Sequence, residues 1–455
     1  MSKPDRKTFA ERSNRLIAFI RTSLANGTYK VGDYLPSELA LAEQFALSKN
    51  SVRAAMERLV EEGLIRKVPR VGTQVAAVGR PNALRVGLYP SLYGDAMMDE
   101  LLALYRSERP GIAVEAVTLP YSNPESIRQL LAYGVLDVAL INNLDYLYFK
   151  ERDALSLFEP YAPEEAAFPF LNKLFAEPTG RVRLRPFVFS PVILCYNRDH
   201  FREAGAFEPD GGWTWEDLRD ASRKLAGANR YGLFFHLSSN NRWPIFLLQR
   251  GVSFDRSDGG PPTPKPPFGL EALRDVRELV HEDGLFPLML SFGLHDVELL
   301  FKQEKASIIL TTYYRLNELS DAPFSFDVAQ LPRTEDGRGD TLLLCTGVGV
   351  SASSGQKEEA ERLANFLLSR RAAASIRRGT FTLPADKRAA DEIAPERPNA
   401  PRRFEIYREM IPHFATYDRL GLSVQELETF GKCLEQYFSK LADEEGLYQL
   451  FRSQA

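Results

Sequence analysis

The 455-residue sequence has only three cysteines and no long apolar run, and these two features limit the classes of protein to which the chain can belong. Cys195, Cys345 and Cys433 lie far apart with no C-x-x-C spacing, which argues against a disulfide framework and against a zinc site. The longest apolar stretch, residues 285–294, is about half of what a membrane-spanning helix needs. Residues 1–12 are polar and charged, so no secretory leader is recognisable. We therefore expect a cytoplasmic protein with reduced thiols and no bound metal.

The composition is that of a water-soluble globular protein, with 44% hydrophobic and 26% charged residues. At roughly 150 residues per domain, the length predicts about three compact units. The charge is divided unevenly, because residues 1–75 carry a net +5 and residues 76–455 a net −9. A basic head on an acidic body is the charge pattern of a chain that binds nucleic acid through its first segment.

The basic head contains three predicted helices followed by a hairpin. Residues 13–26, 37–46 and 48–63 carry apolar side chains at helical spacing, and a serine precedes each of the last two helices as a cap. Residues 64–67 and 71–75 are predicted to be two short strands around a turn at Pro69-Arg70. This order predicts a winged helix-turn-helix over residues 1–76. From the helix pattern alone, a generic three-helix interaction domain remains an alternative.

The polar face of the third helix is the predicted DNA reader. Its apolar stripe packs on the other helices, so the first turn is left to present donors to a major groove. The basic hairpin is placed to contact an adjacent phosphate or minor groove. The side chains concerned are Lys49, Asn50, Ser51 and Arg53 of the helix and Arg66, Lys67 and Arg70 of the hairpin.

Several strings of the head resemble the GntR family of bacterial transcription regulators across residues 13–75. They include Leu35-Pro36-Ser37-Glu38, Ser51-Val52-Arg53, Glu62-Gly63-Leu64-Ile65 and Gly72-Thr73. The resemblance implies that Arg53 and the start of the third helix contact operator DNA, with Thr73 and the wing tip on the backbone and Ser37 also at the interface. Leu39 and Arg70-Val71 depart from the family pattern. A homodimer on a palindromic operator is expected, because one recognition helix reads only a few base pairs.

Beyond a short linker, residues 77–83, the chain changes to alternating strands and helices. Strands are predicted at 84–89, 112–119 and 138–141, with helices at 96–107 and 124–133 between them. This alternation predicts a parallel, doubly wound sheet whose ligand loops lie at the carboxyl ends of the strands. The later segments repeat the alternation and call for a second sheet, and the tail, residues 404–451, is predicted to be helical.

Other strings resemble the bacterial extracellular solute-binding proteins of the sugar-binding type over about residues 84–385. They include Cys195-Tyr196-Asn197-Arg198, Trp213-Thr214-Trp215-Glu216-Asp217-Leu218 and Gly347-Val348-Gly349-Val350-Ser351. The resemblance implies a two-lobed α/β domain of the type II periplasmic-binding-protein kind over residues 84–455. Lobe one is expected at about 84–190 and 346–380, and lobe two at about 191–345 and 381–455. The predicted fold class is thus a winged helix-turn-helix (α+β) followed by this two-lobed domain.

A sugar site needs aromatic faces for C–H patches and planar polar groups for hydroxyls. Four predicted loops offer both chemistries, although an ordinary loop or core-edge role remains open for each residue. The resemblance places Tyr313 where the family often stacks an aromatic ring on the sugar. The candidate ligand residues are Tyr89, Ser91, Tyr93, Asn142, Asn143, Asp145, Asn240, Asn241, Trp243, Tyr313 and Tyr314.

Together the two halves predict a transcription regulator that binds operator DNA, senses a small molecule, most simply a sugar, and changes DNA affinity by lobe closure. No catalytic activity, cofactor or membrane association is expected, and none of the five histidines lies near a recognisable nucleophile motif. The alternative is a pyridoxal-phosphate-dependent body of the aminotransferase type, with Lys440 as its Schiff-base lysine. Only 15 residues follow Lys440, which is too few for the small domain that such a body carries.

Overall fold

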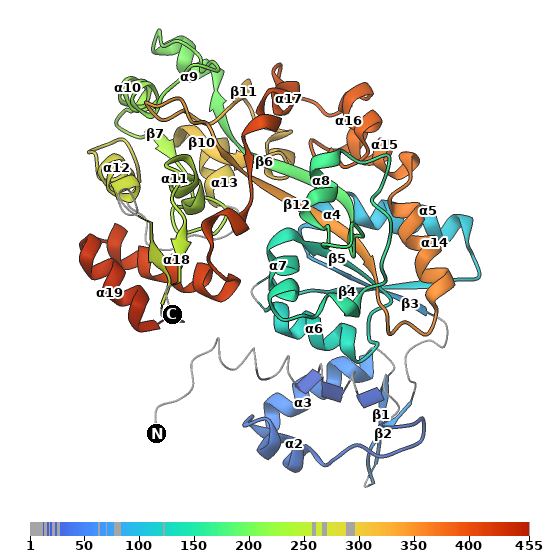
Figure 1. Ribbon diagram of the computed structural model, residues 1–455. Coiled ribbons are helices and arrows are strands. Elements are labelled where there is room, and N and C mark those ends of the chain that lie inside the picture. The colour runs from blue at the N-terminus through green and yellow to red at the C-terminus, as the bar shows by residue number, and fades with distance from the viewer. Residues whose placement is uncertain are drawn as a thin grey trace.

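The computed structural model contains a small N-terminal head and a larger body (Figure 1). The residues that it describes are 12, 16–17, 19–20, 23–24, 28–61, 64–69, 71–76, 83–121, 123–256, 261–265, 271–287 and 296–454. None of the helices within these ranges is long and apolar enough to cross a membrane. The same ranges contain no group of three or more His, Cys, Asp and Glu side chains placed to hold a metal ion. All three cysteines are buried free thiols.

The helices of the head follow the predicted caps. The helix α2 (Glu38–Gln44) begins after Ser37, whose hydroxyl accepts a hydrogen bond from the Ala40 N–H at 3.2 Å. The helix α3 (Lys49–Glu61) follows Ser48, whose hydroxyl accepts one from the Ser51 N–H at 3.2 Å. The described residues of the predicted first helix are helical, and its remaining residues lie outside the described ranges. Leu16, Ile20, Leu41, Val52 and Leu59 form the small core of the head.

The wing is a two-stranded antiparallel hairpin, as predicted. The strands β1 (Ile65–Val68) and β2 (Gly72–Val75) pair with Ile65 opposite Val75 and Val68 opposite Gly72. Ile65 and Val75 are buried against the helices, so the hairpin is held on the core at its open end. The head is therefore a winged helix-turn-helix.

The body begins with the predicted parallel sheet. The strand β3 (Ala83–Leu88) runs parallel to β4 (Ala113–Thr118) on one side and to β5 (Val138–Asn142) on the other. The long strand β12 (Thr341–Val350) then pairs antiparallel with β5. Helices join these strands, so their carboxyl ends come to the same edge of the sheet.

One strand, β6 (Arg185–Asn197), belongs to both halves of the body. Its residues 185–191 pair with β12, and its residues 192–197 pair with β10 (Ala306–Thr312) and β11 (Phe326–Ala329). On the far side, β10 runs parallel to β7 (Tyr231–Phe234). The result is one ten-stranded sheet along the path β4-β3-β5-β12-β6-β10-β7, where the sequence had predicted two sheets. The difference arises because β6 changes partners midway.

Helices cover both parts of this sheet (Figure 1). In the part that contains β3, β4 and β5, here called lobe one, they are α4 (Leu92–Asp95), α5 (Met98–Glu108), α6 (Pro124–Ala132), α7 (Asn143–Glu151), α8 (Pro169–Leu174), α14 (Lys357–Leu367) and α15 (Arg370–Gly379). In the part that contains β7, β10 and β11, here called lobe two, they are α9 (Arg198–Glu203), α10 (Trp215–Leu225), α11 (Trp243–Gln249), α12 (Glu271–Val280) and α13 (Asp296–Lys302). The final segment adds α16 (Lys387–Glu392), α17 (Tyr407–Met410), α18 (Val424–Phe438) and α19 (Glu444–Gln454).

Short elements complete the body. The predicted helical tail is interrupted by β14 (Phe414–Ala415), which runs parallel to the start of β12. The short strand β13 (Leu383–Pro384) pairs with β6, and β8 (Phe254–Asp255) pairs with β9 (Thr263–Pro264).

Candidate functional site

The first turn of α3 presents the predicted DNA-reading face. Lys49, Asn50 and Arg53 are exposed there, and the Arg53 guanidinium pairs with the Glu38 carboxylate of α2 at 3.1 Å. Ser51 is only 6% exposed, and its backbone N–H and hydroxyl are both hydrogen-bonded to the Ser48 hydroxyl at the start of the helix. Ser51 therefore offers little surface for the expected contact with DNA, and the hydroxyl that caps the helix is that of Ser48. The remaining three side chains give the turn the positive and amide donors that phosphates and base edges accept.

The wing contributes two further cations. The Arg66 guanidinium donates two hydrogen bonds to the Gln74 side chain, at 3.0 and 2.8 Å, and Lys67 lies 3.6 Å from Glu57 of α3. Thr73 faces the core with 9% exposure, so its hydroxyl has little surface to offer a DNA backbone. Ser37 is exposed, but its side chain caps α2, and Arg70 lies outside the described residues.

At the carboxyl ends of the lobe-one strands, two tyrosines form a stacked pair. Tyr89, after β3, is 2% exposed, and its ring stacks on Tyr121, after β4, with centroids 5.2 Å apart and planes at 15°. The outer ring, Tyr121, is 43% exposed, and its hydroxyl oxygen accepts a hydrogen bond from the Ser91 N–H at 2.9 Å. Tyr93, in α4, is half-buried, and the charged groups that act on its hydroxyl are Asp99 and Arg106 of α5. Sequence reasoning missed Tyr121, although it lies just beyond a predicted strand, as Tyr89 does.

The side chains of Asp145 and Asn142 lie on the buried side of this tyrosine pair. The Tyr89 hydroxyl donates to the Asp145 carboxylate in the first turn of α7. Asn142 caps that helix, accepting from the Asp145 N–H at 2.8 Å and donating from its amide to the Asp145 carboxylate at 3.1 Å. Burial raises the pKa of Asp145 to about 6, against the hydrogen bonds from Tyr89 and Asn142, and the facing Glu428 of α18 adds to the increase. The Asp145 side chain is thus half protonated at about pH 6.

Two contacts bring α7 of lobe one against the segment from Tyr417 to α18, and a third joins that segment to lobe two. The carboxylate of Glu428 acts on Asp145, as described, and burial raises the pKa of Glu428 as well. The Val424 N–H, in the first turn of α18, donates to both carboxylate oxygens of Glu151 at 3.1 and 3.2 Å. Tyr417 is fully buried, and its hydroxyl donates to the Asn241 side chain at 2.6 Å. The loop before α11 therefore meets the same region from lobe two.

That loop holds two of the predicted amides and a buried arginine. Asn240 and Asn241 are half-buried, and the Asn240 oxygen accepts from the Trp243 indole N–H at 3.1 Å. The Arg242 guanidinium is 8% exposed and donates to the Leu310 carbonyl at 3.1 Å. Burial lowers the pKa of Arg242 to about 10, and Glu298 opposes this decrease. Arg242 therefore fixes the loop that carries the two asparagines to the end of β10.

Three predicted ligand residues are packed in the interior instead. Tyr313 has no exposed surface, and its hydroxyl donates to the Phe404 carbonyl at 2.6 Å while its N–H donates to the Ser190 hydroxyl at 2.8 Å. Trp243 is likewise fully buried, with its ring 5.2 Å from that of Phe430. Asn143 is 9% exposed and bridges to β12 through the Leu343 carbonyl and the Cys345 N–H, at 3.0 and 3.1 Å. The expectation of a ligand contact is corrected to a structural role at all three positions.

Tyr314 differs from its neighbour Tyr313. Its hydroxyl is shielded from solvent, and the side chain of Thr346 on β12 faces it. Burial raises the pKa of Tyr314 well above its ordinary value, and Cys345 and Asp95 increase it further. Because β10 belongs to lobe two and Asp95 to lobe one, this side chain also lies at the junction of the lobes.

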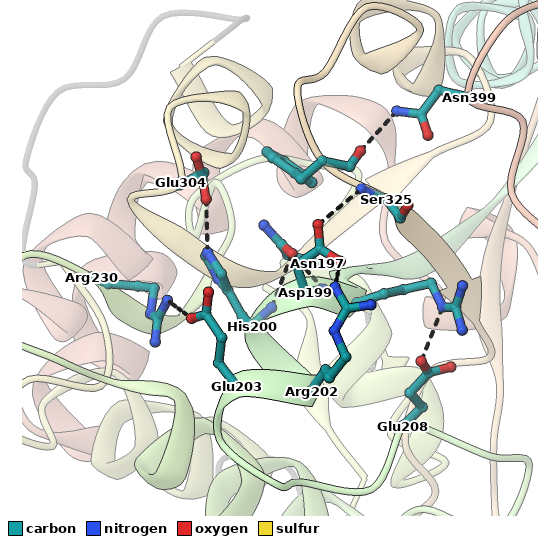
Figure 2. Close-up of polar contacts among 12 residues, drawn as sticks. Asn197, Asp199, His200, Arg202, Glu203, Glu208, Arg230, Glu304, Ser325 and Asn399 are labelled. Atoms are coloured by element: carbon teal, nitrogen blue, oxygen red, sulfur yellow. Dashed lines mark hydrogen bonds and ion pairs between the residues drawn. The ribbon is translucent and has the colours of Figure 1, made fainter.

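A serine, a histidine and a glutamate are aligned elsewhere in lobe two. His200 contacts the Ser307 hydroxyl through Nδ1 at 3.0 Å and Glu304 through Nε2 at 3.3 Å, and Figure 2 shows the contact with Glu304. Ser307 and His200 are 0% and 1% exposed, and burial lowers the pKa of His200. A substrate has no access to this serine, so the group joins α9 to β10 and does not form a catalytic triad. Lys440, proposed above for a pyridoxal-phosphate enzyme, is exposed just beyond α18.

Two protein families match separate parts of the chain. Residues 90–374 match the bacterial extracellular solute-binding proteins, and residues 12–75 match the gntR family of bacterial regulatory proteins. A putative binding protein of Brucella abortus is 24% identical over 306 residues, which are 64% of this chain and 73% of that protein. The galactooligosaccharide-binding protein of Bacillus subtilis is 26% identical over 219 residues, 46% of this chain and 50% of that protein.

A solved structure shares the fold of the body. The ABC substrate-binding protein of Listeria monocytogenes in complex with cycloalternan aligns with a TM-score of 0.68 at 22% identity, over 82% of this chain and 97% of that one. Both matched families are regulators or binding proteins, and neither is enzymatic.

Proposed function

Since the chain belongs to the bacterial extracellular solute-binding protein family and carries a gntR-type helix-turn-helix, we propose that it is a transcription regulator whose body senses a sugar. The observation that carries the sugar assignment is the Tyr89–Tyr121 pair with Asp145 and Asn142 behind it. An exposed aromatic face accepts the C–H patch of a sugar, and carboxylate and amide groups bind its hydroxyls. The names of the relatives, which include binders of galactooligosaccharide and cycloalternan, support the same class of ligand.

The site proposed for the sugar combines both lobes. Lobe one offers the Tyr121 ring, with Ser91 beside it and Asn142 behind, and the predicted ligand residue Tyr93 on the neighbouring α4. Asn240 and Asn241 approach from lobe two. A ligand that contacts both lobes favours the arrangement in which they are closed, because it makes all its contacts only there.

The head is the part of the protein that we propose binds DNA. In our proposal, Lys49, Asn50 and Arg53 enter the major groove of the operator, and Arg66 and Lys67 of the wing contact phosphates. A homodimer would place two such heads on a palindromic site. The sugar can change operator affinity only through its different affinities for the two arrangements of the lobes, so sensing and DNA binding are linked reciprocally.

The experiment that tests the sugar site is a thermal-shift screen of mono- and oligosaccharides, followed by calorimetry on the best ligand. Ligand binding raises the melting temperature by mass action. We expect Tyr121→Ala to abolish the sugar-induced shift. Tyr133→Ala is the matched control, because Tyr133 is also exposed, at 54%, but lies at the end of α6 away from this cluster. A Tyr121→Ala protein that binds the sugar as wild type does would contradict the assignment.

The experiment that tests the output is a gel-shift titration with DNA from the region upstream of the protein's own gene, with and without that sugar. The proposal requires a sugar-dependent change in apparent affinity for DNA. An affinity that is the same at zero and at saturating sugar would refute the coupling, while leaving sugar binding itself untouched.

A further inference from the structure

A cavity of about 260 Å³ lies in lobe two, apart from the residues proposed for the sugar. It is bounded by α10, the last turn of α11, α12 and the segment Arg333–Glu335 between β11 and β12. The apolar part of its wall consists of Trp215, Phe246, Ala272, Val276 and Leu279. The Trp215 and Phe246 rings lie against each other, with centroids 5.1 Å apart. The cavity is small for a ligand pocket, so it suits a small metabolite better than an oligosaccharide.

The arginines around the cavity are not equivalent. Arg219 pairs with Glu282 at 2.5 Å, and Arg250 pairs with Asp275 at 2.6 Å. The side chain of Arg333 makes no hydrogen bond or ion pair with any residue that the structure describes, and its Nε is shielded from solvent. The Nε has therefore lost hydration that no partner replaces, which is unfavourable, whereas the two terminal nitrogens of Arg333 are not among the shielded groups.

The position of Arg333 is fixed by its surroundings. Its N–H donates to the Trp213 carbonyl at 2.8 Å, and its carbonyl accepts from the Trp215 N–H at 3.3 Å. The stem packs on Gly339, where an added Cβ would lie 3.3 Å from the Arg333 Cγ. The guanidinium is thus held at the cavity wall by backbone contacts, and its charge is left for another partner.

We propose that this cavity is a second effector site, which binds a small monocarboxylate with a flat apolar body. The carboxylate pairs with Arg333, and the body lies against Trp215 and Phe246. A guanidinium is matched in shape and charge to a carboxylate. Glu278 and Glu335 also line the cavity, and they disfavour phosphates and other ligands of higher negative charge. The site depends neither on the identity of the sugar nor on DNA binding.

Helix α11 connects this cavity to the proposed sugar site. Its first residue, Trp243, is hydrogen-bonded to Asn240 in the sugar loop, and its last turn, with Phe246 and Gln249, lines the cavity. The Gln249 side chain accepts from the Trp215 indole N–H at 2.8 Å and donates to the Pro332 carbonyl at 3.0 Å. A ligand against Trp215 therefore contacts groups that are hydrogen-bonded to the helix carrying the sugar loop.

The test uses the full-length protein and two probes of the same shape, phenylacetate and the uncharged phenylacetamide. Binding is measured by calorimetry and by quenching of tryptophan fluorescence, since Trp215 lies in the wall. We expect wild type to bind the acid about tenfold or more tightly than the amide, because a charge-assisted pair with Arg333 forms only with the acid. Arg333→Gln is expected to remove this preference. Arg338→Gln is the matched control, because Arg338 belongs to the same connection between β11 and β12 but does not line the cavity, and it should retain the preference.

Two results would overturn the proposal. One is wild-type protein that binds acid and amide equally, or shows no saturable binding below about 10 mM of either. The other is Arg333→Gln protein that keeps the wild-type preference. Melting curves establish that each variant is folded. Should Arg333→Gln fail to fold, Arg333→Lys replaces it: this variant retains the charge and should still prefer the acid, and equal binding of the two probes by it would also count against the site.

Discussion

Replacing Tyr313 by phenylalanine and by alanine separates a packing role for this residue from the ligand-stacking role that the sequence predicts. Tyr313→Phe removes only the hydroxyl that donates to the Phe404 carbonyl at 2.6 Å. The loss leaves a buried carbonyl without its partner, so the free energy of unfolding should fall by about 1–2 kcal/mol. Tyr313→Ala also removes a fully buried ring that contacts Phe404 and Tyr407, with centroids 5.0 and 6.1 Å away. The resulting cavity should cost about 3–5 kcal/mol.

The assay is urea unfolding followed by tryptophan fluorescence, combined with calorimetric titration of the sugar identified by the screen. Tyr313→Phe should show a lower urea midpoint and an unchanged dissociation constant. Tyr121→Ala provides the opposite pattern, because Tyr121 is 43% exposed: its midpoint should move little, while sugar binding is lost. If Tyr313→Ala abolished sugar binding without lowering the urea midpoint, the packing role derived from the structure would be refuted.

Three further predictions concern the head, the acid group of the sugar site and the core of lobe two. Arg53→Ala should weaken operator binding by about 1–3 kcal/mol in a gel-shift titration. Arg58→Ala, nearer the end of α3, should leave operator binding unchanged. If both variants lost affinity for the operator, the assignment of Arg53 to the DNA-reading face would be wrong. The pKa of Asp145 is raised from 3.8 to about 6, so its protonated form favours the folded state below about pH 4, and this contribution, up to about 3 kcal/mol, should disappear as the pH rises to 6. Unfolding measured across that interval should show the decrease in wild type and not in Asp145→Asn; parallel curves would exclude it. Gly232→Ala should lower the melting temperature strongly, because its Cβ would lie 2.1 Å from a backbone oxygen of α10, while Gly227→Ala, with open space, should melt as wild type.

The head could be predicted almost completely because its determinants are local. Helical spacing of apolar residues such as Leu41, Val52 and Leu59 identifies the core face, and the serines before α2 and α3 mark where each helix begins. In the body, alternation along the chain likewise predicts β3, β4 and β5 and their parallel order. The helix caps and the apolar spacing involve residues within one or two turns of one another, and the parallel order follows from the alternation of strands and helices, so the sequence contains the necessary signal.

The candidate ligand site was predicted only in part, because burial depends on residues far away in the sequence. Tyr313 and Tyr89 both follow a strand and both are buried, Tyr313 against Phe404, 91 residues later, and Tyr89 beneath the ring of Tyr121. Trp243 is covered in the same way by Phe430 of α18. Tyr121 follows a strand too, and the alternation that suggested Tyr89 was sufficient to suggest it. The pattern identifies which loops reach the edge of the sheet, whereas tertiary packing decides which rings face outward.

The change of partners along β6 falls beside a proline. Pro191 pairs with β12, whereas Val192 is the first residue of β6 that pairs with β10. Because proline has no N–H, a bend at this position breaks one backbone hydrogen bond fewer than it would elsewhere. The Pro191 carbonyl accepts a hydrogen bond from the neighbouring Ser190 hydroxyl at 2.7 Å. We expect bending to concentrate at this peptide while the ladders on either side stay intact. Each lobe would then rotate as a rigid body, and the angle between the two lobes would differ between the sugar-bound and sugar-free protein. That angle would be the structural change through which sugar binding alters DNA binding.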